Sequence, residues 1–409
     1  MTLSVSARVT DPIYDYKLPL KYQLFRDAMR EFLRTEIADT VEYYDKMEEF
    51  PEENIEKFGK YGYMGIPIPL MYGGAELGEF GYGIAVQEIG KICSSHGTIV
   101  GAHTGLCCVP IWLFGNEEQR KKYLNDLASG KKLGAFGLTE PGAGSDAANL
   151  KTIATKSGDH YLINGTKQFI SNGDRADTIV VFAANDISLG AYGGITAFIV
   201  ERSFGGIMTS KLEKKMGIRG SSTAQITFQD CSVPKENILG TLGAGFIVAL
   251  TALDGGRASL SAGAVGGCEM ALEAMVDRAN NHPRLASQQS VQWMIADTAI
   301  DAHVSRLTSY ASLEEVATYF ERLARGEKIP REERESISRH TAIAKAFCSE
   351  AASRSLERAI QVLGVEGYAE GSGIERGYRD SVIAEIYEGT NDIQRLVIAR
   401  DILNLQNTI

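Results

Sequence analysis

The stretch HYLINGTKQFIS, residues 160 to 171, decides the fold, because the hydrophobic pattern changes there from helical to strand-like. It reads as two strands around Asn164-Gly165, a pair of residues that is the strongest short-range signal for a hairpin. Further strand-like segments follow, separated by glycine and polar turns: TIVVFAAN (178–185), GITAFIVER (194–202) and TAQITFQDCSVP (223–234). We therefore predict a β domain of modest size in the middle of the chain.

Helical patterns flank this β segment on both sides. Apolar side chains recur at three-to-four spacing in residues 21–41, and residues 83–114 are apolar and rich in small side chains, which is typical of a buried helix pair. Two long Ala-rich segments, 257–279 and 340–364, have small residues at the same spacing, which lets helices approach closely. The C-terminal part of the chain therefore reads as a helical bundle.

These patterns predict an α+β multidomain chain. We place an N-terminal helical domain at residues 1–130, a central β domain at 131–240 and a C-terminal helical bundle domain at 241–409. The order is informative, because a β module between two helical blocks can hold one ligand on which both blocks close.

Composition narrows the class of protein. The chain has 409 residues, 44% of them apolar, and a formal net charge of -10, which argues against nucleic-acid binding and against an anionic membrane surface. The N-terminal segment has no apolar core typical of a signal peptide, and no apolar run approaches the ~20 residues that span a bilayer. No Cys-x-x-Cys pair occurs, so we expect buried free thiols, a reducing (cytoplasmic) compartment and no metal site. The six cysteines are Cys93, Cys107, Cys108, Cys231, Cys268 and Cys348.

The string PGAGSDAA, residues 141–148, fits a dinucleotide-binding fingerprint in its letters only. That fingerprint must follow a strand, open a helix and lead into a βαβ unit. Here Pro141 precedes the glycines, and strand-like segments follow them. We therefore reject a Rossmann domain and leave open a Gly-rich turn or a turn whose backbone faces a phosphate or flavin.

Several separate strings, in the right order, resemble the acyl-CoA dehydrogenase family over most of the chain, most closely its short-chain, butyryl-type members. They are LTEPGAGSD (138–146), NGTKQFISNG (164–173), MGIRGSSTA (216–224), LDGGRASLSAGAVG (253–266) and RDSVIAEIYEGTNDIQRLVIAR (379–400). The resemblance implies a helical domain, a central β-barrel domain and a four-helix C-terminal domain. It also implies bound FAD, α,β-dehydrogenation of an acyl-CoA thioester, an electron-transferring flavoprotein as acceptor and a homotetramer.

Glu388, in IYEGTNDIQR, is the catalytic base that the resemblance implies, removing the α-proton while the β-hydrogen passes to flavin N5. Its backbone N–H, with a hydroxyl of the flavin cofactor, would polarise the thioester carbonyl. We expect Gly389 to permit a bend, and Asn391 with Gln394 to form a capping box for the next helix. Some family branches carry the base on an earlier helix, but this chain has Gly256 there, so Glu388 is assigned by exclusion as well.

The resemblance also assigns cofactor and substrate contacts. Tyr387, Gly389 and Ser145 are expected at the substrate, together with Asp254 and Arg257, which would contact the pantetheine chain and support the base loop. The predicted flavin walls are Phe136, Leu138, Thr139 and Ser145 on one side and Phe169, Ile170 and Ser171 on the other, with Thr390 and Asp392 facing the cofactor from the base loop. Pattern alone would place Phe169 and Ile170 in the β core.

A last group of residues resembles those that reach the FAD of a neighbouring subunit: Arg278, Gln289, Gln361 and Gly364. The family usually continues its arginine as R-x-x-F-G, whereas this chain reads RANNHP (278–283), and Val365 replaces a second glycine. These departures leave two alternatives to the dehydrogenase open: an acyl-CoA oxidase that uses oxygen, and a flavin-poor binding or assembly paralogue. His96 and His103 read as satisfied core or surface residues, and the acyl group stays undetermined.

Overall fold

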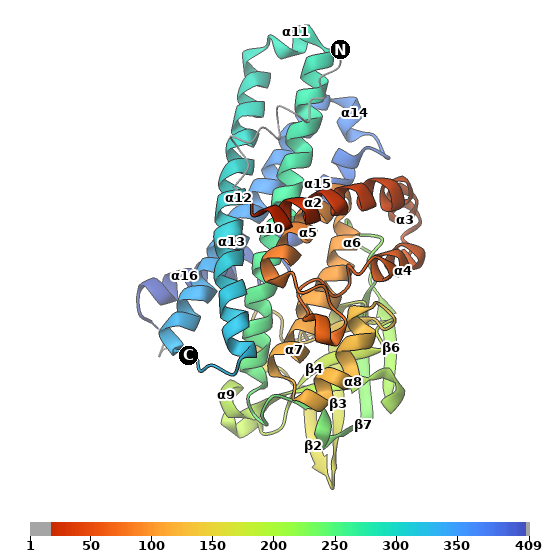
Figure 1. Cartoon of the computed structure of the whole chain (residues 1–409), viewed down its shortest axis with the longest axis vertical. Coiled ribbons are helices and arrows are strands. Elements are labelled where there is room, and N and C mark those ends of the chain that lie inside the picture. The colour runs from red at the N-terminus through yellow and green to blue at the C-terminus, as the bar shows by residue number, and fades with distance from the viewer. Residues whose placement is uncertain (1–17, 406–409) are drawn as a thin grey trace.

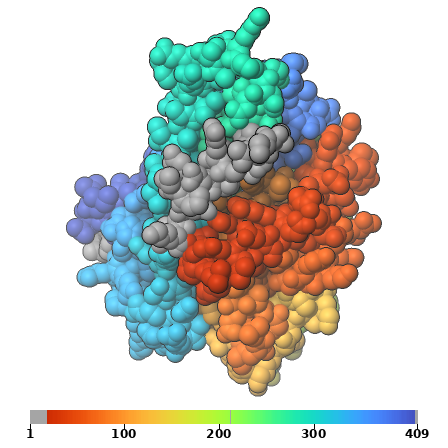
Figure 2. Space-filling model, turned by 45° about the horizontal axis from the view of Figure 1, so that its top comes forward, coloured from red at the N-terminus to blue at the C-terminus, as the bar shows by residue number. Residues whose placement is uncertain are grey.

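The computed structural model describes residues 18 to 405, which form three consecutive parts: a helical part, a sheet and a second helical part. In Figure 1 the long helices of the C-terminal part run along the long axis, and the sheet lies at the lower right below the N-terminal helices. On the face shown in Figure 2, the N-terminal helices, coloured red to orange, lie beside the cyan and blue helices of the C-terminal part.

The N-terminal part is helical, as predicted. Its elements are α2 (Leu20–Phe32), η1 (Leu33–Ile37), η2 (Ala38–Thr40), α3 (Val41–Met47), α4 (Glu52–Lys60), η3 (Leu70–Tyr72), α5 (Gly78–Ile92), α6 (Ser94–Val100), η4 (Gly101–Cys108), α7 (Val109–Phe114) and α8 (Glu117–Ala128). Helix α5 is buried along most of its length and packs on α10 and α12 of the C-terminal part. Element η4 is a π-helix, a wide turn that often marks functional sites.

The segment Ser94–Phe114 corrects one expectation from the sequence. It forms a 21-residue helical run that is long and apolar enough to cross a membrane by length and composition. From the sequence we expected no apolar run of membrane-spanning length. In the fold, 72% of its most apolar window is buried inside the protein, as in the core helix of a globular domain.

The middle part is a sheet with the strand order β6-β7-β3-β2-β4-β5-β8, and β1 pairs with β4. Its strands are β1 (Gly134–Gly137), β2 (Ile153–Ser157), β3 (His160–Ser171), β4 (Thr178–Ala184), β5 (Ile195–Glu201), β6 (Ile207–Leu212), β7 (Thr223–Pro234) and β8 (Ile238–Leu239). The short elements between them are η5 (Ala147–Asn149), η6 (Ile187–Leu189), α9 (Ala191–Gly194), η7 (Arg202–Phe204) and η8 (Lys235–Asn237). Six of the strands, β1 to β5 and β7, enclose a single apolar core, so the sheet is barrel-like, although the pairings among the described strands form a path with two ends.

The predicted hairpin at Asn164-Gly165 is wrong. β3 runs unbroken from His160 to Ser171, with an irregularity in its pairing to β7 between Ile163 and Gly165. Glycine is needed at position 165 because a Cβ there would lie 2.4 Å from Thr152 Oγ1. The side chain of Asn164 makes hydrogen bonds with Asp230 on β7 and takes no part in a turn. The true hairpin joins β2 to β3 at Gly158, which has a φ of 61°.

The C-terminal part is the predicted helical bundle. It contains α10 (Gly245–Asn281), α11 (Pro283–Ala286), α12 (Gln289–Ala324), α13 (Arg331–Leu363), α14 (Val365–Tyr368), α15 (Gly373–Ala384) and α16 (Asn391–Ile402). Helices α10, α12 and α13 pack on one another, and α15 and α16 pack on α13. All six cysteines are buried and free, in agreement with the expectation of unpaired thiols.

Candidate active site

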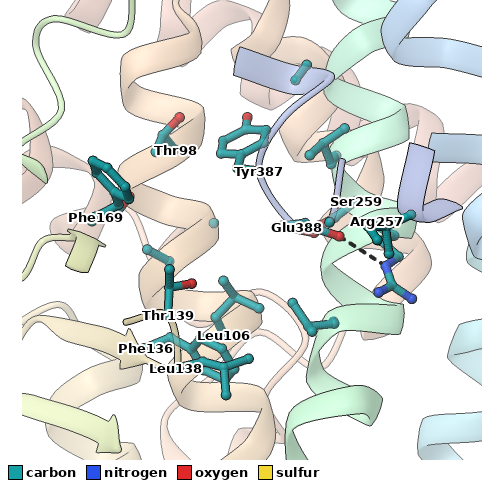
Figure 3. Close-up of a pocket in the computed structure, with 18 of the residues that line it drawn as sticks. Thr98, Leu106, Phe136, Leu138, Thr139, Phe169, Arg257, Ser259, Tyr387 and Glu388 are labelled. Carbon is teal, nitrogen blue, oxygen red and sulfur yellow. Dashed lines mark hydrogen bonds between the residues drawn. The ribbon is translucent and has the colours of Figure 1, made fainter. Parts of the chain in front are cut away.

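A cavity of about 880 Å³ lies where the sheet meets helices of both helical parts. Its walls come from α5, α6 and η4, from β1 and β3, from α10, and from the loop between α15 and α16. Figure 3 shows Phe169, Thr139 and Phe136 on the sheet side, facing Glu388, Arg257 and Ser259 across the cavity. The volume and the mainly apolar lining suit a cofactor together with part of a substrate.

The loop between α15 and α16 presents Glu388 to this cavity. Glu388 and Gly389 have φ values of 55° and 90°, so two successive residues adopt the left-handed conformation, which only glycine adopts without strain. Arg257 Nε donates to the Glu388 carbonyl at 3.2 Å, and Gln394 Nε2 donates to the carbonyls of Glu388 and Gly389 at 3.2 and 2.8 Å. The backbone of the loop is therefore held by side chains of α10 and α16, while the acid side chain is left free.

The Glu388 carboxylate is poised for proton transfer. Its Oε2 atom is buried and has no hydrogen-bond partner among residues 18 to 405. Burial raises the pKa of Glu388 to about 7, and the positive charges of Arg257 and Lys345 limit the rise. A carboxyl group with this pKa can accept a proton near neutral pH and release it again.

Gly256 makes room for this carboxylate. A Cβ at position 256 would lie only 2.5 Å from Glu388 Oε2 and 2.8 Å from its Cδ. The space beside Gly256, the alternative base position considered from the sequence, is therefore filled by the carboxylate of Glu388 itself. The two arrangements exclude each other sterically.

The predicted capping box at Asn391 is wrong. The N-cap of α16 is Thr390, whose hydroxyl accepts from the Ile393 N–H at 3.3 Å. Asn391 Oδ1 instead accepts from the buried Lys345 Nζ at 2.8 Å, and the same ammonium group donates to the Gly389 carbonyl at 2.9 Å. A buried cation needs acceptors on several sides, and Asn391 serves that need in place of the helix end.

Most of the predicted contact residues line the cavity. These are Phe136, Leu138, Thr139, Ser145, Phe169, Ile170, Ser171, Arg257, Tyr387 and Gly389. Phe169 has a φ of 58° and is 61% exposed, so its ring stands in the cavity, whereas Ile170 is 3% exposed and packs in the sheet core. The β-core reading therefore holds for Ile170 and fails for Phe169.

Three predicted residues of the substrate or base-loop group do not line the cavity. Asp254 is buried and accepts from Arg257 Nη1 at 3.1 Å and from Ser338 Oγ at 2.7 Å, so it orients Arg257. Thr390 and Asp392 are not among the residues that line the cavity. Their role toward a cofactor stays a prediction.

The residues predicted to reach a neighbouring subunit lie away from this cavity. Arg278 binds Glu366 and His282 through contacts of 2.8 and 2.7 Å, and Gln289, Gln361 and Gly364 are exposed. A single chain does not bring these four residues to its own Glu388. They lie on the outside of the bundle, and their contact with another subunit stays a prediction.

The sequence missed several groups at the site. Lys345 is fully buried under the base loop, Asp380 lines the cavity and accepts from the Ile218 N–H at 2.5 Å, and Tyr82 lines the cavity from α5. The helical period places Lys345 on the same face as buried alanines, and this spacing could have indicated from the sequence that the lysine is buried. His96 and His103 are both buried, with Asn54 Nδ2 at 3.0 Å and the Gly134 N–H at 2.8 Å as partners. Both ring nitrogens of His103 have partners, whereas His96 Nδ1 has none among the described residues.

The fold and this cavity define a ligand-binding enzyme built from a helical part, a sheet and a helical bundle, with a buried acid beside the ligand space. Family models for the acyl-CoA dehydrogenase N-terminal, middle and C-terminal domains match residues 21–131, 135–231 and 243–403. The chain belongs to the acyl-CoA dehydrogenase family.

Individual relatives agree with this assignment. The short-chain specific acyl-CoA dehydrogenase of Clostridium acetobutylicum is 41% identical over 389 residues, which cover 94% of this chain and 98% of that protein. Butyryl-CoA dehydrogenase from Megasphaera elsdenii superposes with a TM-score of 0.87 at 37% identity, covering 95% of this chain and all of the other. An acyl-CoA dehydrogenase from Bacillus anthracis, solved as a complex with FAD, gives 0.85 at 34% identity, covering 95% and 67% of the two chains.

Proposed function

We propose that this chain is an FAD-dependent acyl-CoA dehydrogenase of the short-chain type in which Glu388 is the catalytic base. The family makes it an oxidoreductase acting on CH–CH groups. The observation that carries the assignment of the base is that Glu388 lines the cavity and has a buried Oε2 atom without a partner among the described residues, with a pKa of about 7.

The cavity fits a flavin. The 61%-exposed Phe169 ring offers a stacking face, Gly144 leaves its side of the cavity open, and Phe136, Leu138, Thr139, Ser145 and Ser171 supply the remaining walls. Bound there, FAD supplies the hydride acceptor for the β-hydrogen. Thr390, Asp392 and, from a neighbouring subunit, Arg278, Gln289, Gln361 and Gly364 would hold its remaining parts.

The residues of the chain prepare and remove the α-proton. The Glu388 N–H has no acceptor among the described residues, so it can bind the thioester carbonyl oxygen and acidify the α-carbon. The carboxylate, kept clear of other donors, then takes the proton. Arg257 and Lys345 hold the loop, so that the backbone N–H and the carboxylate of Glu388 can contact the same substrate molecule.

Further parts of the proposal rest on the family resemblance. We propose a cytoplasmic homotetramer with domains at residues 1–130, 131–240 and 241–409, an acyl-CoA substrate and an electron-transferring flavoprotein as acceptor. Peroxide release on turnover, compared with reduction of that flavoprotein, separates this dehydrogenase from an oxidase. A purified protein that is colourless and takes up no added FAD would instead be the binding or assembly paralogue.

The Glu388→Gln variant tests the base. It should retain bound yellow flavin and lose substrate-driven flavin bleaching by about 10²–10⁴-fold, because the amide cannot accept the α-proton. Rapid anaerobic mixing with butanoyl-CoA measures the rate. Glu385→Gln is the matched control, since Glu385 accepts from Ser353 Oγ and does not line the cavity. Bleaching of the Glu388→Gln variant at the wild-type rate would refute the assignment.

A further inference from the structure

The hydroxyl of Tyr82 is a polar group that the proposed reaction does not use. Tyr82 lies on α5, its side chain is fully buried, and it lines the cavity. Its oxygen has no hydrogen-bond partner within the described part of the chain. A buried hydroxyl without a hydrogen bond is unfavourable, so its presence beside a ligand cavity calls for an explanation.

The helix facing this hydroxyl has no side chains there. A Cβ at Gly101 would have the Tyr82 oxygen as its neighbour at 3.9 Å, and a Cβ at Gly105 would lie 3.3 Å from it. Both glycines belong to the π-helix η4, and Gly101 lines the cavity together with Gly97 of α6. The phenol oxygen therefore stands over bare helix backbone, where larger side chains would close this part of the cavity.

Neighbouring hydroxyl groups of the cavity are already occupied as donors. Thr98 Oγ1 donates to the Ser94 carbonyl at 3.0 Å, and Ser259 Oγ donates to the Gly256 carbonyl at 3.0 Å. Ser259 lies beside the phenol, yet no described side chain meets hydrogen-bond geometry with the Tyr82 oxygen. Because the Tyr82 oxygen meets no acceptor in hydrogen-bond geometry within residues 18–405, its phenol proton can be donated to a ligand.

The charges around Tyr82 select the kind of oxygen that it can bind. The ionisable groups that most affect the pKa of Tyr82 are Glu79, Glu388 and Cys108, and none of these three is a cation. Burial raises the pKa of Glu79 to about 8, which keeps that carboxyl neutral near pH 7. A carboxylate at the end of an acyl chain would find no positive partner at Tyr82, whereas an uncharged oxygen would.

We propose that Tyr82 is a specificity-determining residue whose hydroxyl donates a hydrogen bond to an uncharged oxygen, such as a hydroxyl group, near the end of a short acyl chain. The inference rests on the proposed function, because it assigns the far end of the same acyl cavity. The chemistry at the thioester is unchanged: the α-proton goes to Glu388 and the β-hydrogen leaves as hydride to FAD. The terminal oxygen is bound and does not react.

Matched substrates test the inference with the purified flavin-loaded enzyme. Pentanoyl-CoA and 4-hydroxybutanoyl-CoA have acyl groups with equal numbers of heavy atoms, and they differ by a terminal methyl against a hydroxyl. We expect wild type to favour the hydroxylated substrate in kcat/KM of flavin bleaching by about 3- to 10-fold, the worth of one hydrogen bond. The Tyr82→Phe variant should lose this preference by losing rate with the hydroxylated substrate.

Tyr310→Phe is the matched control, because the Tyr310 hydroxyl donates to Gln87 Oε1 at 2.9 Å and does not line the cavity. It should keep the wild-type preference. Butanoyl-CoA is included with every enzyme: if it fails to bleach wild type, the proposed function itself is wrong. If butanoyl-CoA bleaches wild type but the two matched substrates react equally, or if Tyr82→Phe keeps the preference, the role of Tyr82 is refuted. The wild-type comparison stands even if Tyr82→Phe does not fold.

Discussion

At the scale of single residues, the site depends on one missing side chain. Gly256 leaves the volume that the Glu388 carboxylate occupies, and the backbone of Glu388 is fixed by Arg257 and Gln394. The acid can therefore be buried without being hydrogen-bonded. This combination raises its pKa and keeps its lone pairs for the substrate.

Gly256→Ala should displace the base. The new methyl group would overlap Glu388 Oε2, so we expect kcat/KM to fall by about 10²-fold, the cost of a displacement on the order of 1 Å at a reacting group. Steady-state turnover of butanoyl-CoA measures the effect, with flavin content as a check. Gly267→Ala on the same helix is the control, because its Cβ would meet Ala352 at an ordinary 3.5 Å. Equal turnover in both variants would contradict the packing argument.

Lys345→Met should change the pH dependence of the reaction. Only the deprotonated Glu388 accepts a proton, so kcat/KM should rise with pH through about 7 in wild type. Lys345 favours the carboxylate, hence its removal should raise the pKa of Glu388 and move the inflection to higher pH. Arg395→Met, which loses an exposed pair with Glu350, should leave the profile in place. A shift toward lower pH in Lys345→Met would exclude the electrostatic role.

The sequence could predict Glu388 but not the way in which it is held. Glu388 and Gly389 belong to a string whose spacing resembles a known family, so their place in the site was accessible. Lys345 and the Thr390 cap depend on which groups meet after folding. A lone lysine on an Ala-rich segment looks like a surface charge until its partners Gly389 and Asn391 are in place.

At the scale of elements, periodicity predicted which segments are helices and which are strands. It failed where a glycine serves a distant contact. Gly165 is required by Thr152, which immediately precedes the neighbouring strand β2 and is not part of a turn at Asn164-Gly165. No rule of short-range turn chemistry reports such an approach. The dipeptide Asn-Gly alone therefore does not distinguish a hairpin turn from an irregularity within a strand.

Strand β3 also carries a buried ion pair that anchors the Gly-rich turn. Lys167 Nζ lies 2.8 Å from Glu140 Oε1 with both side chains almost fully buried, and Glu140 also accepts from the N–H groups of Lys151 and Thr152. Glu140 therefore fixes both ends of the turn that contains Gly144 and Ser145. One wall of the cavity depends on this pair.

Lys167→Met should destabilise the protein by about 3–5 kcal/mol, because it leaves the Glu140 charge buried without its cation. Urea unfolding followed by tryptophan fluorescence measures the loss. The double variant Lys167→Met/Glu140→Gln should recover part of it, since the unpaired charge is then removed. A Lys167→Met protein as stable as wild type would show that the pair adds nothing to stability.

At the scale of the whole molecule, one face of the bundle carries apolar side chains at helical spacing. Trp293, Ile300 and Leu307 of α12 are 60%, 60% and 46% exposed and are separated by seven residues each. The residues expected at a neighbouring subunit's FAD also lie on the outside of the bundle. Both observations support the proposed assembly of several chains.

Ile300→Arg should weaken this assembly. Placing a charge in the centre of the stripe disfavours burial against another chain, so the mass in sedimentation equilibrium should fall below that of wild type. FAD should then be retained less well, because Arg278 and Gln289 no longer reach a neighbour. Ile187→Arg, at a 67%-exposed position in η6, is the control. Unchanged mass in Ile300→Arg would remove α12 from the interface.

The six buried thiols can report how often each part of the molecule opens. Cys93, Cys107 and Cys108 sit in the N-terminal helices, Cys231 in the sheet, and Cys268 and Cys348 in the bundle. None can meet a water-borne alkylating reagent until its own surroundings open. Timed labelling followed by peptide mass analysis would thus give the opening frequency of each layer separately, in the unmodified chain and without any inserted probe.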